Sequence, residues 1–155
     1  MWVVNSAHAI LNIMKKFFLL ALLTLINCQI KAQHCNAIVG KWLNKRGEGQ
    51  VEIYQYGNKY LGKLVWLKHP NDAHGKPLTD QRNIRPALRG RPLLGTLIMR
   101  DLTCDGISYT GGSIYDPRRG KTFGCELTMK GNTLKVEAMM GMFPVGSETW
   151  TRVKD

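Results

Sequence analysis

Apolar and polar residues alternate with a period of two along most of the chain beyond Ile38, which is the pattern of β-strands with one buried face. Residues 51–56 and 59–67 both alternate in this way. Between them, Gly57-Asn58 is a two-residue sequence typical of tight turns between antiparallel strands. These segments therefore predict a β-hairpin, and no window of the sequence beyond Ile38 shows a sustained amphipathic helix.

The same pattern predicts further hairpins toward the C-terminus. The sequence Asp116-Pro117-Arg118-Arg119-Gly120 favours a turn, because proline fixes φ and glycine permits a positive φ. Lys130-Gly131-Asn132 favours another. The eight expected strands span 40–42, 51–56, 59–67, 95–102, 107–115, 121–129, 133–139 and 147–153. Strands that mostly connect to the next strand along the chain predict an all-β fold. We expect an eight-stranded antiparallel barrel of mostly up-and-down topology, with a two-sheet sandwich as the alternative.

A long interruption, residues 68–92, follows the third expected strand. It contains four prolines, two glycines and many charged residues. Loops of this length in compact domains are usually functional or disordered. Ile84–Leu88 could form a helical turn within it. We expect this loop to gate the mouth of the barrel.

The first 32 residues have the order of a secretory signal peptide. Lys15-Lys16 is a short basic region, residues 17–26 are apolar, and Ala32 supplies a small residue before the cleavage point. The apolar run is too short to span a bilayer, so we expect an exported protein, periplasmic or secreted, rather than an integral membrane protein. Met14, directly before the lysines, is the expected initiator.

Two alternatives stay open for this segment. It could serve as an N-terminal membrane anchor, or it could carry a lipid at Cys28. Leu25-Ile26-Asn27-Cys28 resembles a lipoprotein signal, although Asn27 stands where a small residue is preferred. Cleavage after Ala32 leaves residues 33–155, which are enough for a single domain with a modest core.

The chain is basic, with 22 lysines and arginines against 11 acidic residues. Loss of Lys15, Lys16 and Lys31 with the signal peptide leaves 19 basic residues and a net charge of about +8. In an exported protein this charge favours anionic lipid, glycan or acidic protein surfaces over nucleic acid. The densest basic stretch is Arg82 to Arg91. A solvated surface that confers solubility is the alternative explanation.

Three cysteines, Cys35, Cys104 and Cys125, lie beyond the signal peptide. In an oxidising compartment one disulfide is expected, and the odd count leaves one thiol. Cys104 and Cys125 fall in neighbouring expected strands, so this pair is preferred. A bond from Cys35 to either of the others would instead tether the mature N-terminus.

The two ends of the expected barrel carry related signals. Gly40-Lys41-Trp42 resembles the Gly-x-Trp signature on the first strand of lipocalins and other calycins. Trp150-Thr151-Arg152 on the last expected strand stands where those barrels carry an arginine that packs on the tryptophan. The resemblance implies a structural closure of the barrel by Gly40, Trp42, Trp150 and Arg152, held by cation–π stacking.

Further blocks carry a more specific resemblance across nearly all of residues 38–153. They are Val51-Glu52-Ile53-Tyr54, Gly62-Lys63-Leu64-Val65-Trp66-Leu67, Asp80, Asn83, Arg91-Pro92-Leu93-Leu94-Gly95, Gly112-Ser113-Ile114-Tyr115-Asp116-Pro117, Gly120-Lys121-Thr122-Phe123 and Thr149-Trp150-Thr151-Arg152-Val153. Together with residues 40–42 they resemble DUF2147, a family of bacterial exported proteins of unknown function. The resemblance implies a lipocalin-like fold and an envelope location, but no reaction. The chain departs from the family pattern at Tyr56 and Leu61, where many relatives have cysteines, and at Phe123, commonly a tyrosine.

Seven residues are candidate ligand-binding positions, each with a structural alternative. Asp80 and Asn83 lie on the long loop, where they could equally cap its helical turn. Tyr115, Asp116 and Lys121 could place a phenol, a carboxylate and an ammonium together, or simply form a turn. The remaining candidates are Trp66, a pocket wall if its strand face points inward, and Met139, in a soft apolar patch that could hold an acyl chain or only pack.

No catalytic residue, metal site or cofactor is expected. His69 and His74 flank one carboxylate, but on a loop with proline and glycine nothing orders them as zinc ligands. The leading hypothesis is a monomeric, exported, lipocalin-like binding protein for a small apolar or amphipathic molecule. The alternatives are a basic module that contacts the envelope surface and, third, an enzyme that uses Tyr115, Asp116 or Lys121.

Overall fold

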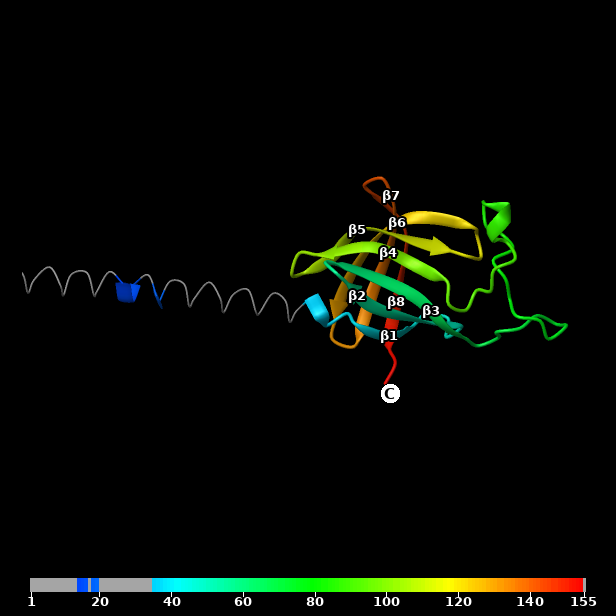
Figure 1. The fold of residues 1–155 in the computed structure, drawn as a ribbon, viewed down its shortest axis with the longest axis horizontal. Coiled ribbons are helices and arrows are strands. Elements are labelled where there is room, and N and C mark those ends of the chain that lie inside the picture. The colour runs from blue at the N-terminus through cyan, green and yellow to red at the C-terminus, as the bar shows by residue number, and fades with distance from the viewer. Residues whose placement is uncertain (1–13, 17, 20–34, 155) are drawn as a thin grey trace, which may run out of the picture.

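The structure is a computed structural model that describes residues 14–16, 18–19 and 35–154. Its strands form one closed antiparallel barrel in which each strand pairs with the next and the last pairs with the first (Figure 1). The strands are β1 (Gly40–Leu43), β2 (Gly49–Tyr56), β3 (Lys59–Leu67), β4 (Leu97–Cys104), β5 (Ser108–Asp116), β6 (Lys121–Lys130), β7 (Thr133–Met140) and β8 (Phe143–Arg152). A 3-10 turn, η1 (Pro86–Leu88), lies between β3 and β4. The predicted eight-stranded up-and-down barrel is therefore confirmed, and the sandwich alternative is excluded.

The predicted signal peptide lies largely outside the described residues, and so do Cys28 and the cleavage point at Ala32. Within the part of the chain that the structure describes, no helix is both long enough and apolar enough to cross a membrane.

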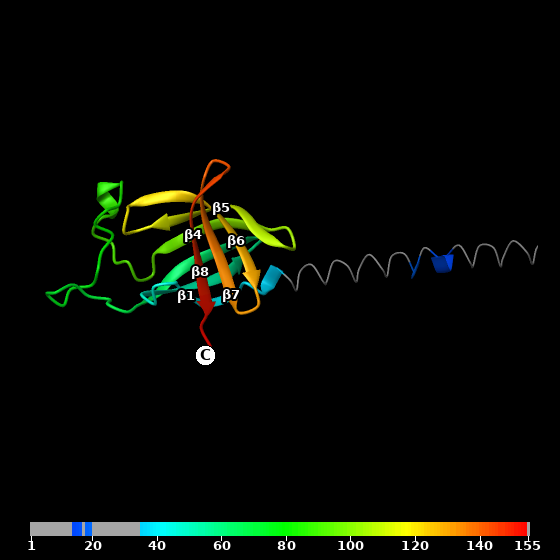
Figure 2. The same cartoon turned by 180° about the vertical axis from the view of Figure 1, so that it is seen from behind.

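The core fills the end of the barrel where the β2–β3, β4–β5 and β6–β7 turns lie. Residues 35–39 also lie at this end, as Figure 2 shows from behind. Tyr60 and Tyr109 meet edge to face there, with ring centroids 5.2 Å apart. The Tyr109 hydroxyl donates to the Cys35 carbonyl at 2.7 Å, and the Tyr60 hydroxyl donates to Asn36 Oδ1 at 3.2 Å. The N-terminal segment is thus fixed across this end, which we call the closed end.

Arg152 completes the closed end from the last strand. Its guanidinium carbon lies 4.2 Å from the centroid of the Trp42 ring, which is the stacking that the calycin resemblance implied. Arg152 also donates hydrogen bonds to the carbonyls of Ala37 and Val39. Gly40 allows this approach, because its φ is 134° and a Cβ there would lie 2.8 Å from Arg152 Nη1.

The disulfide joins Cys35 to Cys104, with the two Cα atoms 5.8 Å apart. The preferred pairing of Cys104 with Cys125 is therefore corrected. Cys125 is a buried free thiol on β6, and β5 lies between that strand and β4, where Cys104 ends the strand. A disulfide cannot cross an intervening strand, because its Cα atoms must lie within about 7 Å of each other. The bond instead ties the N-terminal segment to the barrel, as the alternative foresaw.

Candidate functional site

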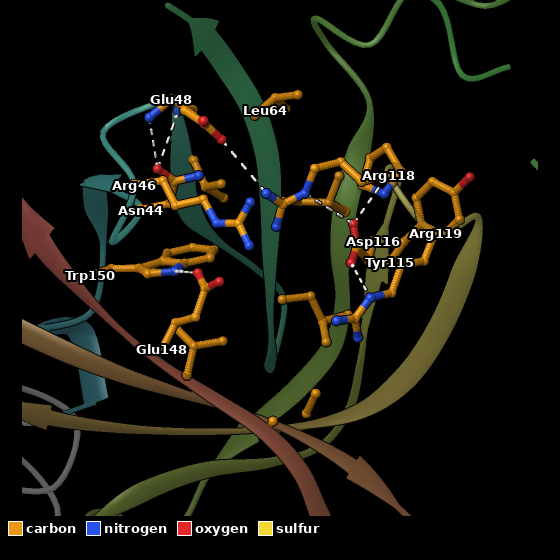
Figure 3. Close-up of a pocket in the computed structure, with 18 of the residues that line it drawn as sticks. Asn44, Arg46, Glu48, Leu64, Tyr115, Asp116, Arg118, Arg119, Glu148 and Trp150 are labelled. Atoms are coloured by element: carbon orange, nitrogen blue, oxygen red, sulfur yellow. Dashed lines mark hydrogen bonds and ion pairs between the residues drawn. The ribbon is translucent and has the colours of Figure 1, made fainter. Parts of the chain in front are cut away.

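A cavity of about 400 Å³ lies inside the barrel. It opens at the end opposite the Trp42–Arg152 pair, where the β1–β2, β3–β4 and β5–β6 connections lie (Figure 3). Its walls are mainly apolar: Val51, Leu64, Leu67, Leu93, Ile98, Ile114, Phe123, Val136, Ala138 and Trp150. They come from most strands of the barrel, because alternate residues of each strand point inward. The site is thus a preformed apolar chamber with one open end.

Charged and polar side chains surround the mouth of this cavity: Asn44, Arg46, Glu48, Asp116, Arg118, Arg119 and Glu148. Arg118 lies 3.6 Å from Glu48 and 3.7 Å from Asp116, and Arg119 lies 3.6 Å from Asp116. These ion pairs are long, and the side chains of Arg118 and Arg119 are 51% and 67% exposed. Such pairs are weak and are screened by salt, so a charged ligand can compete for them.

Two rim residues differ from these pairs. Glu148 accepts a hydrogen bond from the indole N–H of Trp150 at 3.2 Å, so its carboxylate faces the apolar chamber. The guanidinium of Arg46 has no hydrogen bond or ion pair with any residue that the structure describes. In Figure 3 its side chain extends from the β1–β2 connection toward the centre of the mouth. The rim therefore presents one uncommitted cation beside an apolar interior.

Of the seven candidate ligand-binding residues, Tyr115 and Asp116 line the cavity. Trp66 does not, because the β2–β3 register shifts between Gln50 and Val51. Beyond this bulge the inward position passes to Leu67, and Trp66 is left 39% exposed. The strand face on which simple alternation would place Tyr60, Leu64 and Trp66 together therefore ends at Leu64.

Asp80 and Asn83 lie next to the chamber but behind Tyr115. Asp80 is 1% exposed and accepts hydrogen bonds from the Tyr115 hydroxyl at 2.5 Å, from Asn83 Nδ2 at 2.7 Å and from Arg91 Nη2 at 2.8 Å. Burial raises the pKa of Asp80, but these hydrogen bonds and the Arg91 charge outweigh it, so the pKa lies below its ordinary value. Burial, with the bond to Asp80, raises the pKa of Tyr115 to about 12. The cluster is fully paired, which supports a structural role.

The cluster also fixes the long loop to the barrel, because the Tyr115 hydroxyl on β5 donates to Asp80 of the loop. On its other side the Arg82 guanidinium donates to the Arg118 carbonyl at 2.9 Å, and a Cβ at Gly120 would lie 1.8 Å from the Arg82 carbonyl oxygen. No residue of 68–92 lines the cavity. The loop predicted to gate the mouth therefore lies beside it, mostly exposed apart from the buried Asp80 and Asn83, and Ile84–Leu88 contains the expected helical turn as η1.

Lys121 and Met139 lie away from the chamber. Lys121 is exposed opposite Asp116, whose ion pairs go to Arg118 and Arg119 instead. Met139 is half-buried and packs on the β6 backbone at Gly124, where a Cβ would lie 3.2 Å from the Met139 Cβ. The other members of the predicted apolar patch, Met140, Met142 and Phe143, are exposed at the tip of the β7–β8 hairpin.

Sequence reasoning missed the rim residues Arg46 and Glu148 and most of the apolar wall. The alternation of β7 carried part of this signal, because Val136 and Ala138 share one face with Leu134. Nothing in the sequence marked Arg46 apart from other exposed cations. Among the described residues no group of three or more His, Cys, Asp or Glu side chains could hold a metal ion. Asp72, between His69 and His74, caps its own turn by accepting from the backbone N–H of His74 and Lys76.

Comparison with solved structures shows one similar barrel, described as "Protein HP1028 from the human pathogen Helicobacter pylori belongs to the lipocalin family". The two chains superpose with a TM-score of 0.63 at 24% sequence identity, over 76% of this chain and 84% of the other. At this identity the similarity concerns the fold alone, which is lipocalin-like. No curated protein matches the sequence.

The sequence also matches a protein family over most of the barrel. The family model described as "Uncharacterized protein conserved in bacteria (DUF2147)" matches residues 40–152, from the first residue of β1 to the last residue of β8. The match includes both members of the Trp42–Arg152 pair and every residue that lines the cavity. The chain therefore belongs to the DUF2147 family.

Proposed function

We propose that this protein is an exported, monomeric binding protein that takes a small apolar or amphipathic molecule into the barrel. The observation that carries the proposal is the chamber of about 400 Å³ inside the barrel, with mainly apolar walls. Ligand pockets are typically concave, mostly apolar and of roughly 300–1,000 Å³. An eight-stranded barrel is just wide enough to hold one small ligand.

The side chains that form the chamber are held before any ligand arrives. Trp150 is 5% exposed, and its N–H is committed to Glu148. Leu64 and Val136 are buried in opposite walls. A ligand then gains free energy mainly by removing its apolar surface from water, at little cost in ordering the protein.

The proposal includes no reaction. Covalent catalysis at this site would need an activated hydroxyl or thiol nucleophile. Tyr115 is the phenol in the wall, and its hydroxyl donates to Asp80. Cys125 is buried, and burial raises the pKa of its thiol to about 12, which disfavours the nucleophilic thiolate. These groups support a binding role over catalysis.

Export is part of the proposal. It rests on the basic and apolar order of residues 15–26, and the Cys35–Cys104 disulfide supports it. Disulfides form and persist in the periplasm and outside the cell, where the environment is oxidising. Fractionation of the source cell, with detection of the mature chain in the envelope or medium, tests this part. Recovery of an unprocessed chain in the cytosol would contradict it.

Native mass spectrometry of protein purified from its source, together with binding of a fluorescent fatty-acid probe, tests the binding role. Ala138→Phe adds a ring inside the chamber and is expected to abolish probe binding. Ala87→Phe, the same change at an exposed position of η1, is expected to leave it intact. Circular dichroism of both variants checks that each is folded. No co-purifying ligand and no probe binding by the wild type would overturn the proposal.

A second candidate function is contact with anionic envelope surfaces. It is favoured by the exposure of Arg82, Arg85 and Arg89 around Ile84, which is itself 81% exposed. Binding to anionic vesicles should then weaken with salt and when these three arginines are changed to Ala. The matched control changes three exposed lysines elsewhere, Lys121, Lys130 and Lys154. An equal loss of vesicle binding in both variants would indicate that net charge alone causes the binding. Vesicle binding that does not depend on salt would exclude this function.

A further inference from the structure

We propose that the ligand of the chamber is an amphiphile with an anionic head group, which Arg46 and Arg118 bind at the mouth while its apolar chain fills the interior. This inference rests on the binding role proposed above and specifies the chemistry of the ligand. The head group is a carboxylate or a phosphate, since both match the planar donor fork of arginine.

The first support is the state of Arg46. Arg118 and Arg119 share the carboxylates of Glu48 and Asp116, whereas Arg46 pairs with none of the described residues. A guanidinium presents five N–H donors. At the mouth, these donors are free to meet an anion from solution.

The second support is the weakness of the Arg118 contacts. Its guanidinium is 3.6 Å from Glu48 and 3.7 Å from Asp116, distances beyond those of charge-assisted hydrogen bonds, which are roughly 2.7–2.9 Å. The Glu48 side chain is 52% exposed and can turn into solvent. An incoming anion can therefore replace Glu48 as the partner of Arg118. Figure 3 shows the Arg46 side chain directed toward Arg118, so both cations can address one head group.

The third support is the change from polar to apolar lining just inside the rim. Below the charged ring the wall consists of residues such as Trp150, Leu64 and Val136. The ligand must therefore carry its charge at one end. A molecule charged along its length would leave charges unpaired against these walls, which is costly.

Glu148 opposes this assignment and supplies a test of it. Its carboxylate also lines the mouth and has one hydrogen bond, from Trp150. It should repel an anionic head group. Glu148→Gln keeps an oxygen that can accept the indole N–H and removes the charge, so it is expected to strengthen binding of an anion and leave a neutral ligand unaffected.

Isothermal titration of the wild type with four ligands that share one chain tests the proposal: dodecanoate, dodecyl phosphate, dodecanol and dodecylamine. The two anions are expected to bind at least about tenfold more tightly than dodecanol, and dodecylamine the most weakly. The tighter of the two anions then distinguishes a carboxylate from a phosphate head group. A higher salt concentration should weaken the binding of the two anions and leave the binding of dodecanol unchanged.

Arg46→Gln is expected to weaken the binding of both anions about tenfold and to leave the affinity for dodecanol unchanged. Lys45→Gln removes a neighbouring exposed cation that does not line the cavity, and it serves as the matched control. Equal affinity for all four ligands, or no effect of Arg46→Gln, would overturn the anionic head group while the binding role stands. Binding of none of the ligands would overturn both.

Discussion

The guanidinium of Arg152 stacks on the indole of Trp42, 4.2 Å from the ring centroid. Trp42 lies on the first strand and Arg152 on the last, and the two are direct partners in the β1–β8 register. Trp42 also donates its indole N–H to the Ile38 carbonyl at 2.8 Å, and Arg152 donates to the carbonyls of Ala37 and Val39. The pair therefore joins both ends of the barrel and its N-terminal segment at one point.

Arg152→Ala is expected to lower the free energy of unfolding by roughly 1–3 kcal/mol, because the stacking is lost and the Ala37 and Val39 carbonyls lose their donor. Urea denaturation monitored by tryptophan fluorescence measures this. Arg100→Ala, at an exposed position of β4, is the matched control and should change stability by less than about 0.5 kcal/mol. An unchanged melting temperature for Arg152→Ala would contradict the closure role.

Gly120→Ala should detach the long loop from the β5–β6 turn. The φ of Gly120 is +65°, and an added Cβ would meet the Arg82 carbonyl oxygen at 1.8 Å, a backbone atom that cannot rotate away. We expect a loss of about 2–4 kcal/mol from backbone strain and overpacking. Gly90→Ala, where no atom lies within 4 Å and φ is ordinary, is the control. Hydrogen exchange across residues 68–92 should rise in the first variant alone.

The barrel could be predicted from sequence because period-two alternation and turn residues act locally. Gly57-Asn58 and the turn at 116–120 each determine a hairpin register without help from distant residues. The closure pair was also accessible, through the resemblance of Gly40-Lys41-Trp42 and Trp150-Thr151-Arg152 to the two ends of calycin barrels. These features depend on short-range patterns or on position in the chain.

The candidate site was less accessible because it depends on register and on side-chain pairing across strands. One β-bulge between β2 and β3 moved Trp66 from the predicted wall to the surface. The paired state of Asp80 depends on Tyr115 and Arg91, 35 and 11 residues away in sequence. The uncommitted state of Arg46 is likewise a property of its neighbours in space. Local sequence patterns do not encode such contacts.

The disulfide gives a prediction for peptide mapping under non-reducing conditions. A peptide that contains Cys35 should be joined to one that contains Cys104, while Cys125 remains a thiol. Because Cys125 is buried and its pKa is about 12, alkylation at neutral pH should require unfolding. Removing the bond with Cys35→Ser and Cys104→Ser should cost about 2–4 kcal/mol, since it closes a loop of 69 residues. A peptide with Cys104 joined to Cys125 would contradict the structure.

Asp80 should make stability depend on pH in the acid range. Its folded pKa lies below the ordinary value of 3.8, so the unfolded chain binds its proton first as the pH falls. The stabilisation by Asp80 is therefore fully present above about pH 4 and is lost as the pH falls through the folded pKa.

Asp80→Asn tests this dependence. At neutral pH this change should lower the free energy of unfolding by about 2–3 kcal/mol, because Arg91 keeps its charge without a partner. The loss is smaller than for a fully buried pair, since the Arg91 side chain is 31% exposed. Denaturation at several pH values should show the difference between wild type and variant shrinking below about pH 4, where Asp80 of the unfolded wild-type chain becomes protonated while the folded chain still holds the carboxylate. Asp101→Asn, at an exposed position of β4, is the control variant. If the deficit of Asp80→Asn were the same at all pH values, the Asp80 carboxylate would not be the charged group that holds Tyr115 and Arg91.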